Sequence, residues 1–169
     1  MIAAPAPPAP AEKRQQSGGR RRSVARLAAV QALYQLELNP DLDAASVIRE
    51  FVGHRLGREI DGDNYGEADA KLFGEIVEGV AAHRAPLDEA ISAVLTEEWP
   101  LPRLETILRA ILEAGAYELM HRQDVPPRVT ISEYVGIAYA FFTGKEPGLA
   151  NGVLDRLART LRAADLSSP

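Results

Sequence analysis

The chain has 169 residues, of which 46% are hydrophobic and 25% charged, and it contains no cysteine. This size and composition are typical of one globular domain and exclude a fully disordered or fibrous chain. The lack of cysteine excludes disulfides, zinc-thiolate sites, iron–sulfur clusters and thiol nucleophiles. No apolar run approaches the roughly 20 residues that cross a bilayer, and the Pro-rich residues 1–19 lack a signal-peptide core. We therefore expect a cytoplasmic protein without a membrane contact.

Charge is distributed unevenly along the chain. Residues 1–26 contain six Lys or Arg and one Glu, a local net charge of +5, and the total of −5 leaves −10 for the other residues. A basic arm on an acidic body suits binding of a polyanion by the arm and of a basic protein by the body. The charge pattern alone equally allows a solvated tail without a binding role.

The first part of the chain changes from low complexity to helical periodicity. Residues 1–19 are rich in Pro and Ala and predict a disordered arm, followed by one all-helical domain over residues 20–165. Apolar residues at steps of three and four predict a first helix from Ser23 to the Asn39-Pro40 pair. Asp41 or Asp43 can cap a second helix, and residues 57–66 are a polar, Gly-rich loop.

The remaining elements follow the same periodicity. A third helix ends near Pro86, a fourth covers residues 87–95, and a connector over residues 96–102 contains Trp99. A fifth helix covers residues 104–119, a capping box at residues 130–133 begins a sixth, and a seventh carries residues 153–161. The fold class we expect is all-α, with about seven helices in two small helical subdomains. These share one core and are separated by the connector near Trp99.

Residue patterns for catalysis and cofactor binding are missing. The histidines His54, His83 and His121 lie in different predicted elements, which favours surface or helix-end roles over metal ligation. A segment beginning at Asp61 resembles a calcium loop, but its fifth and twelfth positions are Tyr and Leu instead of oxygen ligands. We find no phosphate loop, dinucleotide fingerprint or nucleophile elbow. We therefore expect no enzyme, no catalytic residues, no metal and no cofactor.

The arginines near the start of the first predicted helix carry more information. Arg20, Arg21 and Arg22 precede that helix and Arg26 lies in its first turns, where the helix dipole disfavours cations by roughly a few tenths of a kcal/mol each. A bound phosphate would explain this placement, because free N–H groups and forked Arg contacts both suit its oxygens. Aromatic faces for unstacked bases must come from elsewhere. The candidates are Tyr139, Phe141 and Phe142, although for Tyr139 and at least one of the two Phe residues we expect burial in the core instead.

Several strings occur in an order that resembles one family. They are Arg20-Arg21-Arg22, Ala29-Val30-Gln31-Ala32-Leu33-Tyr34-Gln35, Ala116-Tyr117-Glu118-Leu119, Asp124-Val125-Pro126, Ile131-Ser132-Glu133 and Asn151-Gly152-Val153-Leu154-Asp155. Over residues 20–162 this order and spacing resemble the NusB family of bacterial transcription antitermination factors.

The resemblance implies an all-helical fold of two small bundles and a function in ribosomal RNA transcription. Family members bind boxA RNA together with the ribosomal protein NusE, and the pair joins an RNA polymerase antitermination complex. The RNA-binding candidates that this implies are Arg20, Arg21, Arg22, Arg26, Phe142, Lys145 and Leu149. The NusE-facing candidates are Tyr34, Tyr117 and Glu118. Leu149-Ala150 stands where Phe-Val is frequent in the family, which removes a stacking face, and formation of a homodimer stays open.

Two other functions compete with RNA-dependent antitermination. A helical adaptor could use the acidic body for protein binding alone, but the basic arm and its place at a helix start argue against it. A related helical domain also precedes the catalytic domain of an rRNA cytosine methyltransferase family. Few residues follow the last predicted helix, so we expect no such catalytic domain here.

Overall fold

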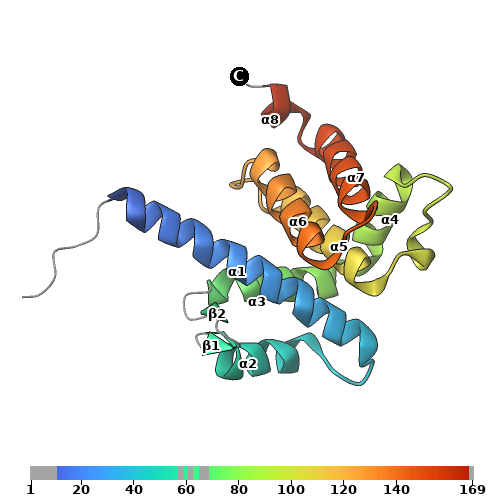
Figure 1. Cartoon of the computed structure of the whole chain (residues 1–169). Coiled ribbons are helices and arrows are strands. Elements are labelled where there is room, and N and C mark those ends of the chain that lie inside the picture. The colour runs from blue at the N-terminus through green and yellow to red at the C-terminus, as the bar shows by residue number, and fades with distance from the viewer. Residues whose placement is uncertain (1–10, 57–58, 61–62, 65–68, 168–169) are drawn as a thin grey trace, which may run out of the picture.

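The fold is described from a computed structural model for residues 11–56, 59–60, 63–64 and 69–167, with side chains for residues 18–56 and 69–166. Three helices form one group (Figure 1): α1 (Ala11–Leu38), α2 (Ala44–His54) and α3 (Ala70–Ala82). Four helices form the other: α4 (Arg84–Val94), α5 (Thr106–His121), α6 (Pro127–Phe141) and α7 (Glu146–Leu161). The expected all-α fold in two helical groups is confirmed.

Short elements complete the structure. A single 3₁₀ turn, η1 (Leu101–Arg103), precedes α5, and the five-residue α8 (Ala163–Ser167) follows α7. Within the polar loop, β1 (Glu59–Ile60) pairs antiparallel with β2 (Asp63–Asn64). The remaining loop residues 57–58, 61–62 and 65–68 lie outside the described residues, as does part of the segment that resembles a calcium loop.

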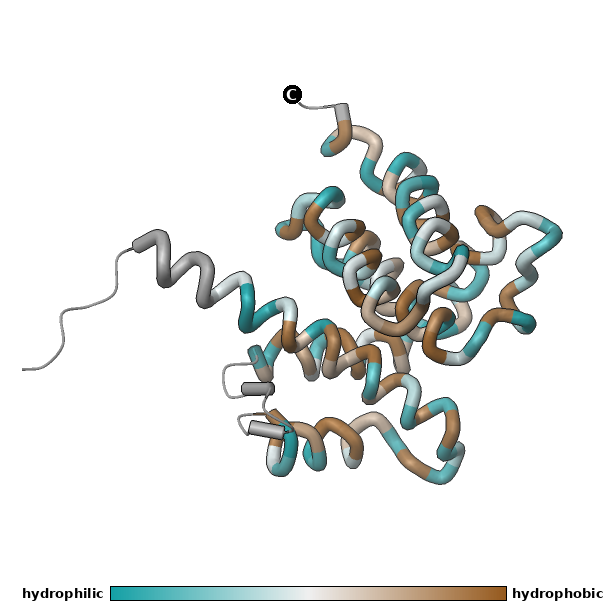
Figure 2. Tube along the Cα trace, in the orientation of Figure 1, coloured by the Kyte–Doolittle hydropathy of each residue, from teal (hydrophilic) through white to brown (hydrophobic). Residues whose placement is uncertain are grey.

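Helix α5 is the centre of the packing, because it contacts α1, α3, α4, α6 and α7. Its side chains at Leu108, Ile111, Leu112 and Leu119 are buried and belong to one core cluster that draws on both helix groups. Figure 2 shows the same arrangement as hydrophobic residues on the inner faces and hydrophilic residues along the outer faces. The prediction of two helical groups that share a core is therefore confirmed.

The boundary between the two groups lies elsewhere than predicted. Helix α4 packs against α5 and α7, so the connector with Trp99 lies inside the second group. The chain passes from one group to the other at His83, a single residue between α3 and α4. Pro86 sits in the first turn of α4, where a missing N–H is tolerated, so it does not end the preceding helix.

Two predicted helix starts are also corrected. Helix α1 begins at Ala11, twelve residues before Ser23, so residues 11–19 of the expected disordered arm are helical and residues 1–10 lie outside the described part. Its first residues, from Glu12 to Gln16, are mostly strong helix formers. Helix α6 begins at Pro127, because a proline suits the first helical position. The predicted capping box at residues 130–133 therefore lies inside the helix and does not begin it.

One predicted cap is confirmed. The carboxylate of Asp43 accepts a hydrogen bond from the backbone N–H of Ser46 at 2.7 Å and begins α2. Hydrogen bonding to the ionised form lowers the pKa of Asp43. None of the helices in the described part of the chain is long and apolar enough to span a membrane.

Candidate RNA and partner interfaces

Three consecutive arginines form a row on α1. Because α1 begins at Ala11, Arg20, Arg21 and Arg22 lie within the helix, about two and a half to three turns after its first residue, and the prediction that they precede it is wrong. The free N–H groups of the helix start therefore lie away from these arginines, whose side chains alone remain as phosphate ligands. Arg20, Arg21 and Arg22 are exposed, and the first turns of α1 project beyond the other helices (Figure 1). The backbone at this point is anchored, because the N–H of Asp69 before α3 donates to the carbonyl oxygen of Arg21 at 3.1 Å. Three guanidinium groups therefore stand on one fixed helical segment.

Arg26, the fourth predicted RNA contact, is not on this surface. It is 2% exposed, and its Nε and Nη2 atoms donate to the two carboxylate oxygens of Glu118 at 2.8 and 2.9 Å. Burial opposes the charged form, but the hydrogen bonds and charge of Glu118 raise the pKa of Arg26 above its usual value. The prediction of a direct RNA contact for Arg26 is wrong, because its guanidinium is used inside the core.

Glu118 is corrected for the same reason. Its side chain is fully buried, and it also accepts a hydrogen bond from the hydroxyl of Tyr134. Burial, together with the neighbouring Glu118 carboxylate, raises the pKa of Tyr134 well above its usual value. A buried carboxylate with these partners cannot contact a docked protein, so Glu118 joins α5 to α1 and α6 instead.

The connection between α6 and α7 contains the second set of predicted RNA contacts. Lys145 is exposed, whereas Phe142 and Leu149 are half-buried and pack against the core. Exposed aromatic faces come from two neighbours instead, Tyr139 at 70% and Phe141 at 42% exposure. The expected burial of Tyr139 in the core is therefore wrong, whereas the expected burial of one Phe applies in part to Phe142.

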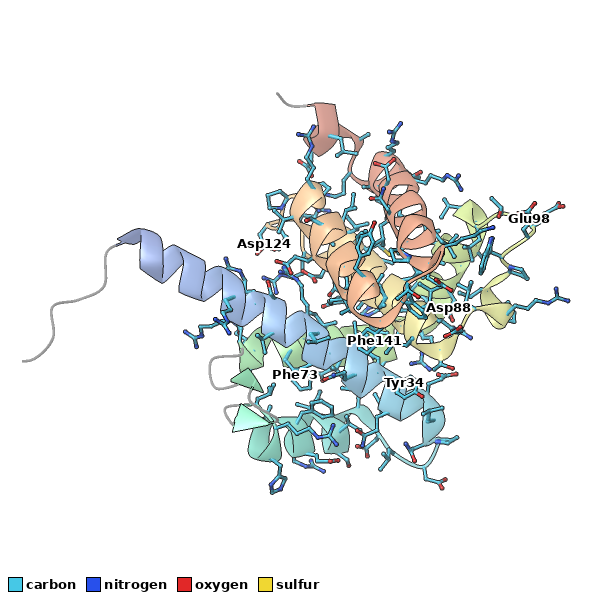
Figure 3. The ribbon with its side chains drawn as sticks, viewed as in Figure 1. Tyr34, Phe73, Asp88, Glu98, Asp124 and Phe141 are labelled. Carbon is cyan, nitrogen blue, oxygen red and sulfur yellow. The ribbon has the colours of Figure 1, made fainter. Side chains whose placement is uncertain are left out.

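A groove of about 990 Å³ opens between α1, α2, the start of α5 and the end of α6. Its lining includes Tyr34, Leu38, Phe51, Ile107 and Phe141. Figure 3 shows Tyr34 and Phe141 close together, although they come from α1 and α6. Three of these apolar side chains are more than a third exposed, which is typical of a surface that a partner covers. Tyr34, one of the predicted partner contacts, thus lies in this groove.

Tyr117 lies on a different surface, at the ends of α3 and α5. Its ring lies on the backbone of Gly79, where a Cβ atom would overlap it, and its centroid is 5.1 Å from that of His121. The ring of His83 is 4.7 Å from His121, and burial and the neighbouring His83 lower the pKa of His121. The structure thus brings together two histidines that the sequence places in separate elements. No group of three or more potential metal ligands occurs in the described ranges.

Sequence reasoning also missed a chain of alternating charges between α1, α4 and α5. Arg84 contacts Glu37 at 2.7 Å and the buried Glu113 at 3.5 Å, and Arg109 contacts Asp88 at 2.7 Å and Glu113 at 3.9 Å. Burial and the nearby Asp88 raise the pKa of Glu113 to about 8. The sequence signal for this network is local: Arg109 and Glu113 have opposite charges four residues apart on α5.

Comparisons with known proteins agree with these features. Residues 23–159 match the model of the NusB family. Transcription antitermination protein NusB from Rhodopseudomonas palustris is 49% identical over 147 residues, covering 87% of this chain and 86% of that protein. The protein of the same name from Brucella anthropi is 53% identical over 142 residues, covering 84% of each chain.

Solved structures show the same fold. The structure of T. maritima NusB has a TM-score of 0.71 and 29% identity, over 87% of this chain and 97% of that one. A chain in the crystal structure of antitermination factors NusB and NusE in complex with dsRNA has a TM-score of 0.69 and 21% identity. That match covers 83% of this chain and 98% of the other, and it supports the fold alone.

Proposed function

Because the chain belongs to the NusB family, we propose that it is a transcription antitermination factor that binds RNA together with the ribosomal protein NusE. The RNA is a boxA-like element of ribosomal RNA operons, and the complex acts on RNA polymerase in the cytoplasm. Relatives at about 50% identity carry the antitermination name, and a solved relative was crystallised with NusE and dsRNA. The protein acts by binding, without catalysis or a cofactor.

The observation that carries the RNA part is the exposed row of arginines on α1. Arg20, Arg21 and Arg22 occupy consecutive positions and span about 200° of the helix circumference, so an RNA strand that crosses the exposed side of α1 can contact more than one of them. Arginine recognises phosphate through forked hydrogen bonds, which supply affinity and salt dependence. Lys145 on the α6–α7 connection adds a further exposed cation.

The partner part is supported by the groove around Tyr34. Its exposed apolar residues offer area for a protein, and Glu105 and Arg55 on its rim supply both signs of charge. The net charge of −10 outside residues 1–26 favours a basic partner, as ribosomal proteins commonly are. We place NusE in this groove, with Tyr34, Leu38 and Phe141 as contacts.

Salt-dependent RNA binding tests the RNA part. If each arginine neutralises about one phosphate, the variant Arg20→Ala/Arg21→Ala/Arg22→Ala should lower the single-strand salt slope by roughly 0.7 per residue, about two in total. The matched control Arg49→Ala/Arg103→Ala/Arg128→Ala removes the same charge from exposed positions on α2, η1 and α6 and should leave the slope close to the original. Equal slopes for both triple variants would contradict an RNA site on α1.

Binding with and without NusE tests the partner part. NusE should tighten the RNA complex, and by linkage RNA should tighten the protein pair by the same factor. Leu38→Glu places a charge in the apolar groove and should weaken NusE binding while leaving RNA binding to the protein alone unchanged. If RNA affinity is the same with and without NusE, cooperative loading is wrong and the helical adaptor without an RNA role is favoured.

A further inference from the structure

A second, smaller groove of about 360 Å³ lies between α1 and α6, beside the arginine row. Its lining comes from two residues of α1, Ser23 and Leu27, and from five of α6: Ser132, Glu133, Gly136, Ile137 and Ala140. Ser23 directly follows Arg22. Arg20 lies seven residues before Leu27, which places it on the same face of α1 about two turns away. The groove therefore lies next to the arginine row of α1.

The walls of this groove are mostly apolar, with Ser23 and Ser132 as neutral polar residues and one acidic position. Leu27, Ile137, Ala140 and Gly136 supply carbon surface, and a Cβ atom at Gly136 would meet nothing within 4 Å. The groove therefore has free space beside Gly136. A mostly apolar groove of this kind suits the face of an unstacked nucleobase.

The acidic position is Glu133, which is held in place by two contacts. Its Oε1 atom accepts a hydrogen bond from the hydroxyl of Ser23 at 2.8 Å and lies 3.7 Å from Nη1 of the buried Arg26. Its side chain keeps 26% of its surface exposed. These contacts use only part of the acceptor capacity of a carboxylate, which has two oxygens and about four lone-pair directions.

A fixed carboxylate beside three arginines requires an explanation in an RNA-binding surface, because it repels phosphates. It attracts an exocyclic amino group, since carboxylates accept hydrogen bonds from the N4 amino group of cytosine. Tyr139 adds an aromatic face at the rim, three residues after Gly136 and seven after Ser132, on the same side of α6.

We infer that the groove between α1 and α6 reads one unstacked base of the bound RNA, with Glu133 selecting cytosine over uracil. The apolar walls take the base and Glu133 accepts from its amino group. Uracil presents a carbonyl oxygen at the same position, which the carboxylate repels. Arg20 and Arg22 hold the flanking phosphates. This inference rests on the proposed function. It adds base selectivity to the RNA contact, because phosphate contacts by the arginines alone do not distinguish one base from another.

The test compares single C-to-U changes along a boxA-like RNA, with binding measured by fluorescence anisotropy. For the original protein we expect one position at which cytosine is preferred by about tenfold, the low part of the range for one good base contact. In Glu133→Gln the amide can donate to uracil, so the preference at that position should fall to about twofold or less. The Ser23 hydrogen bond can be kept by the amide oxygen, and the salt slope should not change because no cation is removed.

A second variant fills the groove without removing any polar group. Gly136→Leu directs a side chain into open space and replaces a poor helix former by a good one, so the fold should be kept. It should weaken RNA binding by about tenfold and abolish the base preference. Gly53→Leu on α2, which also meets nothing within 4 Å, is the matched control and should behave as the original protein.

Each result has a defined meaning. A base preference that survives both variants overturns the inference, while loss of binding in the arginine triple variant still supports the proposed function. Loss of NusE binding with unchanged RNA selectivity in Gly136→Leu shows that the groove is a protein contact and also overturns the inference. Absence of RNA binding by the original protein, with and without NusE, overturns the proposed function itself.

Discussion

The buried ion pair between Arg26 and Glu118 allows a quantitative test of the internal packing. Replacement of Arg26 by Met keeps a long side chain but removes both hydrogen bonds, at 2.8 and 2.9 Å, to a carboxylate that has no exposed surface. The Tyr134 hydroxyl remains as a hydrogen-bond donor to Glu118. Removing one member of a buried pair costs about 3–5 kcal/mol, because the other charge stays buried without compensation.

A double-variant cycle separates this penalty from the value of the pair. In Arg26→Met/Glu118→Leu no buried charge is left, so the double variant should lose less stability than Arg26→Met alone. The unpaired Tyr134 hydroxyl then accounts for about 1–3 kcal/mol of what remains. Arg20→Met is the exposed control, and its effect should stay within about 0.5 kcal/mol.

Urea unfolding followed by circular dichroism measures these differences, from the midpoint and the slope of each transition. A typical domain has about 5–15 kcal/mol in total, so Arg26→Met should shift the midpoint strongly. A loss below about 1 kcal/mol, or additive effects of the two substitutions, would show that the guanidinium is not buried against Glu118 in solution.

Three further predictions concern packing and pH. Ile111→Ala removes a fully buried side chain of α5 and should cost about 2–5 kcal/mol in urea unfolding, whereas a loss below about half a kcal/mol would mean that the helix presents another face. Gly79→Ala would force the Tyr117 ring away and should cost about 1–3 kcal/mol, in contrast to Gly53→Ala, which should gain about 0.5–1 kcal/mol. The pKa of Glu113 is raised from 4.5 to about 8, so the folded state binds more protons in this window and the free energy of unfolding falls as pH rises through it. Glu113→Gln should flatten that fall between about pH 4.5 and about pH 8, and an unchanged pH profile would contradict the raised pKa.

The helices could be predicted because their signals are local. Apolar residues three and four apart identify buried faces, as at Leu72, Ile76 and Val80, which are all buried in α3. The cap at Asp43 depends on a residue three positions away. The false capping box at residues 130–133 shows the limit of this reasoning, because the local pattern is satisfied while Glu133 bonds to a residue 110 positions earlier.

The charged residues of the site were harder to assign for a related reason. Arg26 continues a row of arginines in the sequence, and its partner Glu118 lies 92 residues later. Short-range patterns cannot show that one member of a basic run turns inward. A signal was nevertheless present, because Arg26 and Glu118 each lie among small and apolar residues of a buried helix face, where an unpaired charge is too costly to occur.

The position of α1 has a consequence for how the protein opens under native conditions. Helix α1 contacts α2 and α3 in one group and α5 and α6 in the other, so neither group keeps its buried surface if the middle of α1 unfolds. Amide hydrogens from Ala25 to Leu33, which are mostly buried, should exchange only through global unfolding. Amide hydrogens of the projecting first turns should exchange through local fraying. One continuous helix thereby has an end that frays locally, where bound RNA should slow amide exchange. Its middle is rigid and prevents the two helix groups from unfolding separately.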